Sequence, residues 1–117
     1  MREGGRIIHI GSTNSERMPF VGGSVYALTK AAVAGFTRGV ARDLGPRGIT
    51  VNNVQPGPID TELNPASGEW AAGQKAAVPL GRYGRADEVA ALVAFVAGPE
   101  SSFINGANLT VDGGVNA

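Results

Sequence analysis

The sequence contains no cysteine and a single histidine, His9, among its 117 residues. A chain without thiols forms no disulfide and no thiolate metal site, and one histidine cannot supply a zinc cluster built on histidines. Lysine and arginine together number 10, as do aspartate and glutamate, so the formal net charge is 0. Such a balance provides no basic surface for nucleic acid or an anionic membrane. We therefore expect no metal centre and no nucleic-acid or membrane partner.

Long hydrophobic runs are missing as well. The longest run without a polar residue, residues 89–97, has nine residues, whereas a membrane-spanning helix needs about 18 or more. Residues 1–5 (MREGG) precede a predicted strand and contain no apolar core of the kind found in a signal peptide. We expect a cytoplasmic protein.

Glycine, in contrast, is abundant. The chain has 18 glycines, about twice the usual share of roughly 7%. Because 43% of the residues are apolar, the chain is too hydrophobic to be disordered, and we expect its glycines in turns and close backbone approaches. A chain of this length has room for one domain.

Apolar periodicity and turn residues predict an alternation of strands and helices. We expect strands over residues 6–10, 49–54 and 108–111, helices over residues 24–44 and 87–97, and short helices with a flap over residues 59–84. Strands separated by helices run parallel, with right-handed crossovers. The prediction is an α/β fold, half of a doubly wound Rossmann-type sheet with about three parallel strands and flanking helices.

Two of these elements carry further expectations. The nearly continuous apolar content of residues 6–10 favours a buried strand in a sheet covered on both faces. On the long helix, apolar residues recur every four positions and predict one apolar stripe. That stripe consists of Leu28, Ala32, Phe36, Val40 and Leu44.

The long helix also contains the pair Tyr26 and Lys30. Positions four apart lie on one helical face, so the ammonium can favour the phenolate form of the tyrosine. A free tyrosine has a pKa of about 10 and needs such help to exchange protons near neutral pH. The same spacing is common on helices for packing and solubility alone, so the pair by itself does not indicate catalysis.

Two other segments bring polar and glycine residues to the same edge of the predicted sheet. Ser12 follows the first strand, and Pro56 and Gly57 begin the segment 56–61 that follows the second. Open α/β sheets bind ligands at the carboxyl ends of their strands. Each feature alone is explained as a turn hydroxyl or a strand terminator, but together with Tyr26 they predict a ligand site.

These residues resemble the short-chain dehydrogenases/reductases, and most of all the 3-oxoacyl-carrier-protein reductase type. The residues that carry the resemblance are Ser12, Tyr26, Lys30, the segment 51–57 (VNNVQPG) and the segment 111–114 (VDGG). Residues 45–49 and 55–65 are similar to a bacterial subgroup of biofilm dispersal mediators that bind cyclic-di-GMP. The resemblance extends over essentially the whole chain.

The resemblance implies an oxidoreductase that transfers a hydride between a nicotinamide cofactor and a small-molecule carbonyl or secondary alcohol. The implied catalytic residues are Ser12, Tyr26 and Lys30. Ser12 would hold and polarise the carbonyl, Tyr26 would donate or accept the proton, and Lys30 would lower the pKa of the phenol.

The resemblance also implies NAD or NADP as cofactor, with NADP favoured. Tyr26 and Lys30 would contact it, Pro56 and Gly57 would seat the nicotinamide, the Ile59 backbone would bind the carboxamide, and Thr61 would lie near the phosphates. Residues 62–80 would close over the substrate.

The sequence departs from the family pattern in lacking the glycine-rich fingerprint that binds the pyrophosphate. We therefore interpret residues 1–117 as a single partial domain, the catalytic and substrate-binding half of the family fold without its N-terminal dinucleotide-binding half. We expect these residues alone not to turn over substrate.

A homo-oligomer is also implied by the resemblance, through the 24–44 helix and the C-terminal strand. Small residues at Ala27, Ala31, Gly35 and Gly39 form a row on that helix. The row either permits a close contact between subunits or lets the helix sit tightly on its own sheet.

Two other functions stay open at this point. One is a regulatory protein that binds a nucleotide such as cyclic-di-GMP without turnover, and the other is a fragment without activity. A pure binding protein has no physical reason to retain Ser12, Tyr26 and Lys30 together, which favours the enzyme.

Overall fold

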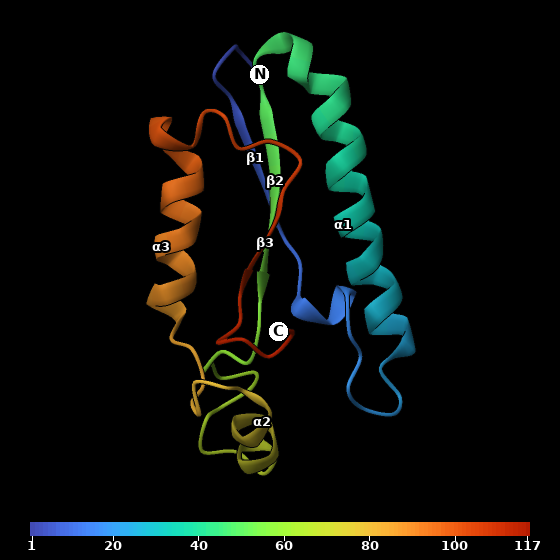
Figure 1. Ribbon diagram of the computed structural model, residues 1–117, viewed down its shortest axis with the longest axis vertical. Helices are drawn as coiled ribbons and strands as arrows, with labels where there is room; N and C mark the ends of the chain where they lie inside the picture. The colour runs from blue at the N-terminus through green and yellow to red at the C-terminus, as the bar shows by residue number, and fades with distance from the viewer.

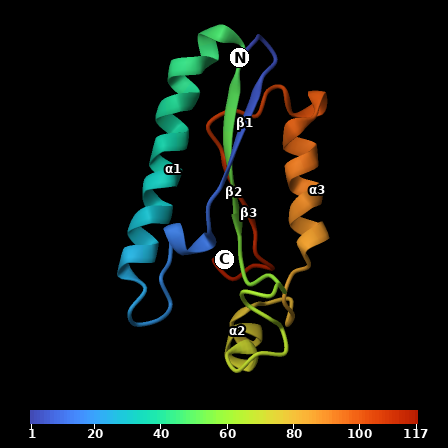
Figure 2. The same cartoon turned by 180° about the vertical axis from the view of Figure 1, so that it is seen from behind.

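The computed structural model describes residues 1–117, and its centre is one parallel sheet with the strand order β1–β2–β3. Helices α1 and α3 lie on opposite sides of this sheet, and the short helix α2 lies beyond the end where β2 finishes (Figures 1 and 2). The predicted α/β architecture is confirmed. The elements are β1 (Arg6–Ile10), α1 (Ser24–Leu44), β2 (Thr50–Pro56), α2 (Ala71–Ala77), α3 (Ala86–Ala97) and β3 (Asn108–Val111).

Three elements have the bounds expected from the sequence, namely β1, α1 and β3. The middle strand begins at Thr50 and continues to Pro56, beyond the predicted end at residue 54, and α3 begins one residue early, at Ala86. The segment 59–84 contains one α-helix, α2, where several short helices were expected.

Burial is concentrated on the central strand. Val51 and Val54 of β2 are fully buried, whereas Ile10 at the end of β1 is 51% exposed. β1 pairs with β2 alone, so it forms an edge of this sheet. Residues 6–9 are half-buried and Ile10 is exposed, so the expectation of a buried strand is wrong, although helices lie on both sides of the sheet as expected.

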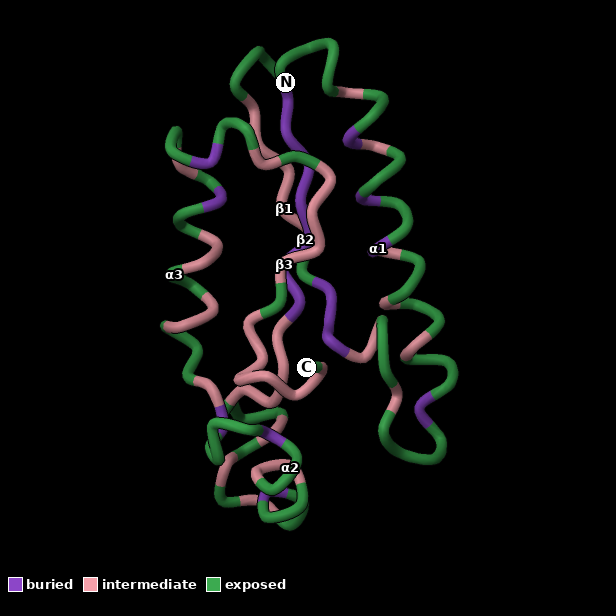
Figure 3. The backbone as a smooth tube through the Cα atoms, viewed as in Figure 1, coloured by how far each residue is buried: buried purple, intermediate pink, exposed green.

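The apolar stripe predicted on α1 does not face the sheet along its whole length. Leu28 is 68% exposed and Phe36 is 63% exposed. A step of four residues advances by about 40° more than one full helical turn, so a row with that spacing winds around the helix. The side of α1 turned toward the sheet is visible in Figure 3, and its buried residues are Ala34, Thr37 and Ala41.

The row of small residues on α1 also lies away from the sheet. A Cβ atom placed on Gly35 or Gly39 meets no atom within 4 Å. Ala31 is exposed as well. The row therefore does not serve to seat α1 on its own sheet, and that interpretation of the sequence is wrong.

Asparagine side chains connect β2 to the segment before β3. Asn52 is 1% exposed, and its Nδ2 donates to the Ile104 carbonyl at 2.9 Å. The Ala107 amide donates to Asn52 Oδ1 at 3.0 Å. Asn53 Nδ2 donates to Asn108 Oδ1 at 2.8 Å. The two bonds of Asn52 satisfy part-buried backbone groups in the irregular segment before β3, which would otherwise destabilise the fold.

Candidate active site

Gly11 separates Ser12 from β1, and Ser12 is the N-cap residue of the short 3-10 helix η1 (Thr13–Ser15). Its side chain is buried, and Oγ accepts a hydrogen bond from the Asn14 amide at 3.1 Å. A Cβ atom on the preceding Gly11 would lie 2.6 Å from Asn53 Oδ1. Glycine at this position therefore allows the chain to approach β2 closely before it reaches Ser12.

Tyr26 lies in the first turn of α1, and Lys30 follows one turn later. Tyr26 is 46% exposed. Lys30 is half-buried, and its Nζ lies over the ring, 5.7 Å from the ring centroid. The expected placement of both side chains on one face of the helix is confirmed.

A cleft of about 450 Å³ lies at the carboxyl end of the sheet. It brings together four of the residues singled out in the sequence, namely Ser12, Tyr26, Pro56 and Gly57. The segments that carry them follow β1, begin α1 and end β2, so the fold gathers residues that are up to 45 positions apart along the chain.

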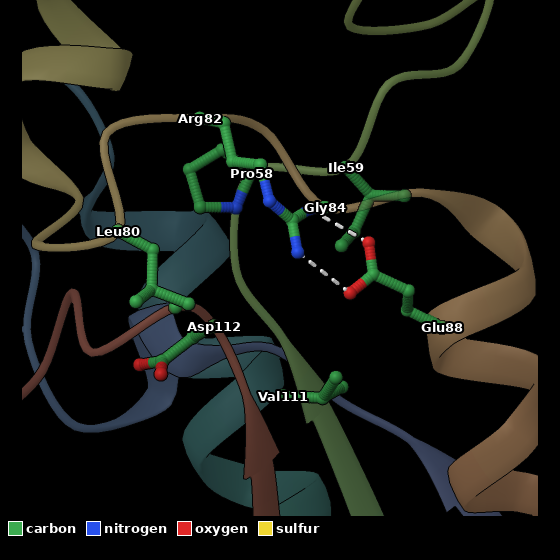
Figure 4. Close-up of a pocket in the computed structure, with 9 residues that line it drawn as sticks. Pro58, Ile59, Leu80, Arg82, Gly84, Glu88, Val111 and Asp112 are labelled. Carbon is green, nitrogen blue, oxygen red and sulfur yellow. Dashed lines mark hydrogen bonds and ion pairs between the residues drawn. The ribbon is translucent and has the colours of Figure 1, made fainter.

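The other three predicted site residues lie outside the lining of this cleft. Lys30 stands next to Tyr26. Ile59 lines a separate pocket of about 50 Å³, drawn in Figure 4. Thr61 is exposed, and its Oγ1 accepts a hydrogen bond from the Asn64 amide at 3.2 Å.

The small pocket of Figure 4 contains an ion pair. Arg82 donates two hydrogen bonds to the carboxylate of Glu88, at 2.7 and 2.9 Å. The hydrogen bonds from Arg82, and next the one from the Arg85 amide, lower the pKa of Glu88 to about 2. The same pair raises the pKa of Arg82. A volume of about 50 Å³ holds one or two water molecules, so we assign this ion pair to holding the start of α3.

The far wall of the main cleft contains residues that the sequence did not single out. Asn64 and Gln74 both line it, and Asn64 Nδ2 donates to Gln74 Oε1 at 2.9 Å. Phe20 and Val115 add apolar surface. The expected flap over residues 62–80 indicated the region, but no local pattern marks these side chains because they meet through long irregular segments.

The polar groups of the cleft define the chemistry that it can support. Three hydroxyl residues line it, and of these Thr13 donates its proton to the Pro56 carbonyl, which leaves Ser12 and Tyr26 as donors for a ligand. The Lys30 ammonium lies over the Tyr26 ring, and no carboxylate is part of the lining. Hydroxyl donors of this kind can bind and protonate a carbonyl oxygen.

Nowhere in the chain do three or more His, Cys, Asp or Glu side chains form a group able to bind a metal ion. None of its helices combines the length and hydropathy needed to span a bilayer.

Comparison with known proteins decides the family. The sequence matches the family described as Enoyl-(Acyl carrier protein) reductase over residues 1–116. The structure matches a short-chain dehydrogenase/reductase from Serratia marcescens over the whole chain, with 60% identity and a TM-score of 0.98. The chain belongs to the short-chain dehydrogenase/reductase family. The resemblance read from the sequence is thereby confirmed.

Other short-chain dehydrogenases/reductases match equally well in structure. One from Burkholderia cenocepacia, solved in complex with NADP, has 57% identity and a TM-score of 0.98. This chain covers 48% of that protein and 48% of the Serratia marcescens protein.

Two curated relatives differ in their described functions. The Cyclic-di-GMP-binding biofilm dispersal mediator protein of Escherichia coli is 53% identical over the whole chain, which covers 49% of that relative. The 3-oxoacyl-[acyl-carrier-protein] reductase FabG of Vibrio cholerae is 45% identical over 95% of the chain, which covers 46% of that relative. The chain therefore spans about half the length of the curated relatives it matches.

Proposed function

We propose that this chain forms the catalytic and substrate-binding side of an NAD(P)-dependent oxidoreductase that interconverts a carbonyl and a secondary alcohol. The observation that carries the proposal is that Ser12 and Tyr26 line one cleft while Lys30 lies against the tyrosine ring. Membership of the family supports the same reaction class. The substrate is a small molecule that reaches both hydroxyls.

In the proposed reduction, Tyr26 donates its hydroxyl proton to the carbonyl oxygen, and it takes the proton back in the oxidation. The Lys30 ammonium stabilises the phenolate that is left after donation, because an opposite charge nearby favours the charged form. Ser12 binds the same oxygen. Its Oγ already accepts a hydrogen bond from the Asn14 amide, which leaves the hydroxyl proton available for the carbonyl.

The cleft fits the nicotinamide end of the cofactor. Its volume of about 450 Å³ lies within the range of roughly 300–1,000 Å³ common for small-molecule sites. The segment from Pro56 to Pro58 contributes an uncharged edge against which a flat ring can lie. Ile59 and Thr61 follow on the same segment and would hold the carboxamide and phosphate groups. When bound, the cofactor supplies the hydride.

NADP is the cofactor we favour, because the Burkholderia cenocepacia structure was solved in complex with NADP. A 3-oxo ester is the substrate class we would test first, because the Vibrio cholerae relative is described as a 3-oxoacyl-[acyl-carrier-protein] reductase.

The test is the variant Tyr26→Phe in the protein as its gene encodes it, with NADPH oxidation measured on ethyl acetoacetate. Removing the proton donor is expected to lower kcat by about a hundredfold or more. The control is Tyr83→Phe, which removes a hydroxyl outside the cleft lining and with it one 3.3 Å hydrogen bond to Asn64 Oδ1. Its kcat is expected to fall far less than that of Tyr26→Phe, because no proton donor is lost from the cleft. Equal activity of Tyr26→Phe and the wild type would disprove the proposed role.

A second function is favoured by one comparison, the 53% identity with the cyclic-di-GMP-binding protein of Escherichia coli. In that case the cleft binds the nucleotide and no turnover is needed. Titration calorimetry with cyclic-di-GMP separates the two functions. A sensor binds the nucleotide equally in the wild type and in Tyr26→Phe, and its wild type oxidises no NADPH.

We also propose that the chain self-associates through the outer face of α1. Val25, Leu28 and Phe36 on that helix are 72%, 68% and 63% exposed. Contiguous exposed apolar surface of this kind is typical of an interaction site, and the uncovered glycines next to it allow close approach of a second helix.

A further inference from the structure

The short helix η1, which follows Ser12, is held by side chains from two distant parts of the chain. Gln55 Nε2 donates to Ser15 Oγ at 2.6 Å. Asn116 Nδ2 donates to the Thr13 carbonyl at 2.7 Å. Thr13 Oγ1 in turn donates to the Pro56 carbonyl at 3.3 Å. The end of β2 and the segment after β3 therefore both hold η1 through hydrogen bonds.

Asn116 is itself held in place. The carboxylate of Asp112 accepts hydrogen bonds from the Gly114 amide at 2.9 Å and from the Asn116 amide at 3.1 Å. The turn after β3 is thus fixed before the side chain of Asn116 reaches Thr13. The Thr13 carbonyl also accepts from the Glu16 amide at 3.1 Å and from the Arg17 amide at 3.4 Å, so the bond from Asn116 is the shortest of the three.

The position of Ser12 depends on η1 because the two are joined by short-range bonds. The Ser12 carbonyl accepts from the Ser15 amide at 3.0 Å, and Ser12 Oγ accepts from the Asn14 amide at 3.1 Å. A displacement of η1 therefore moves the backbone and the hydroxyl of Ser12 together.

Gln55 provides an independent indication that these hydrogen bonds to η1 serve more than the stability of the fold. Its side chain is fully buried, and its Oε1 has no hydrogen-bond partner. An unpaired buried amide oxygen is unfavourable, and an apolar side chain of similar size would avoid that cost. What Gln55 supplies in exchange is the bond to Ser15.

We propose that Asn116 and Gln55 are positioning residues, which fix η1 and through it the Ser12 hydroxyl in the cleft. The inference rests on the proposed function, in which Ser12 binds the carbonyl oxygen. Displacement of a group that orients a reacting atom by about 1 Å costs up to roughly a hundredfold in rate.

The first test is Asn116→Ala in the protein as its gene encodes it. We choose Asn116 because it is only half-buried, and we therefore expect the variant to fold. For the reduction of ethyl acetoacetate we expect kcat to fall about tenfold, with the KM for NADPH unchanged. We expect the pH at half-maximal kcat to stay the same, because Tyr26 and Lys30 belong to α1 and are not touched. Thr110→Ala, an exposed residue of β3 without a side-chain hydrogen bond, is the matched control.

The second test measures how firmly η1 is held and needs no enzymatic turnover. Amide hydrogen exchange at Ser15, whose N–H is bonded within η1, is expected to quicken about tenfold in Asn116→Ala and to stay unchanged in Thr110→Ala. Exchange at Val54 in the central strand should be the same in all three proteins.

The outcomes separate this inference from the proposed function. Unchanged exchange at Ser15, or unchanged kcat in Asn116→Ala, overturns the positioning role. A raised KM for NADPH with a shifted pH profile also overturns it, since the whole cleft would then have loosened. If the wild type itself oxidises no NADPH, the proposed function fails, and so does the role of Asn116 and Gln55 in positioning Ser12 for catalysis. The exchange measurement then still decides whether Asn116 holds η1.

Discussion

The Nζ atom of Lys30 lies 5.7 Å from the centroid of the Tyr26 ring, and the pair sits at the rim of the cleft. A second pair has nearly the same geometry, with Lys75 Nζ 5.9 Å from the centroid of the Tyr83 ring. The difference lies in the surroundings of the phenols. Tyr26 lines the cleft and is 46% exposed, whereas Tyr83 is 5% exposed.

This contrast gives the first prediction. Lys30→Met is expected to lower kcat at neutral pH by about tenfold to a hundredfold, because the phenolate of Tyr26 loses its stabilising charge. Lys75→Met, which removes the same type of contact away from the cleft, should leave kcat within about threefold of the wild type. The measurement is the pH profile of NADPH oxidation. A profile of Lys30→Met that coincides with that of Lys75→Met would refute the assigned role.

The second prediction concerns the buried Asn52. Asn52→Leu leaves the carbonyl of Ile104 and the amide of Ala107 without their partners. Because both groups are part-buried and lose their partner, the free energy of unfolding should fall by roughly 1–3 kcal/mol. Chemical denaturation measures this, with Thr110→Ala as the exposed control that should change it by less than about 0.5 kcal/mol. A loss no greater than the control's would show that these two bonds do not hold the segment before β3.

The third prediction follows from the ion pair at the start of α3. The pKa of Glu88 is lowered to about 2 in the folded protein, so this carboxylate stabilises the fold fully above its unfolded pKa of about 4.3. That stability is lost as the pH falls through the window from about 4.3 to about 2. Glu88→Gln should therefore lower Tm at pH 7, and the difference from the wild type should shrink toward pH 2.

Thermal unfolding followed at several pH values checks the Glu88 prediction. The control is Glu100→Gln, because Glu100 is exposed and takes part in no ion pair. Its Tm should match that of the wild type throughout. A Tm difference for Glu88→Gln that stays constant from pH 7 to pH 2 would argue against an electrostatic origin.

The fourth prediction tests the outer face of α1. The wild type is expected to self-associate at micromolar concentration, and Leu28→Glu should shift it toward the monomer because a charge replaces an apolar side chain that is 68% exposed. Ala91→Glu, on the exposed side of α3, introduces the same charge elsewhere and should leave the association unchanged. Light scattering or sedimentation velocity measures the mass. A monodisperse wild-type monomer would contradict the prediction.

The sequence predicts the order of elements well because the glycine and proline residues that end each strand or helix lie next to it in the chain. Gly11 ends the first strand, Gly45 and Pro46 follow the long helix, and Gly98 with Pro99 follows the last one. It predicts burial poorly for α1, because a row of residues four apart winds away from the side that packs on the sheet. Leu28 and Phe36 belong to such a row and are exposed, while the buried Thr37 does not.

One part of the candidate site could likewise be predicted from the sequence, and another part could not. The meeting of Ser12 with Tyr26 and Pro56 follows from the rule that parallel strands end at one edge of the sheet. The opposite wall does not follow, because Asn64, Gln74 and Val115 reach the cleft through irregular segments whose path depends on tertiary contacts. The contact of Asn116 with Thr13 could not be predicted for the same reason, since 103 positions separate the two residues.

The first turn of α1 carries Tyr26, and the same end of that helix exposes Val25 and Leu28 to solvent. A neighbour that covers these two side chains also restrains the turn on which the phenol is mounted. We therefore expect the proposed activity and the proposed self-association to depend on each other through this turn of α1. Dilution that separates the subunits should lower the turnover of each one.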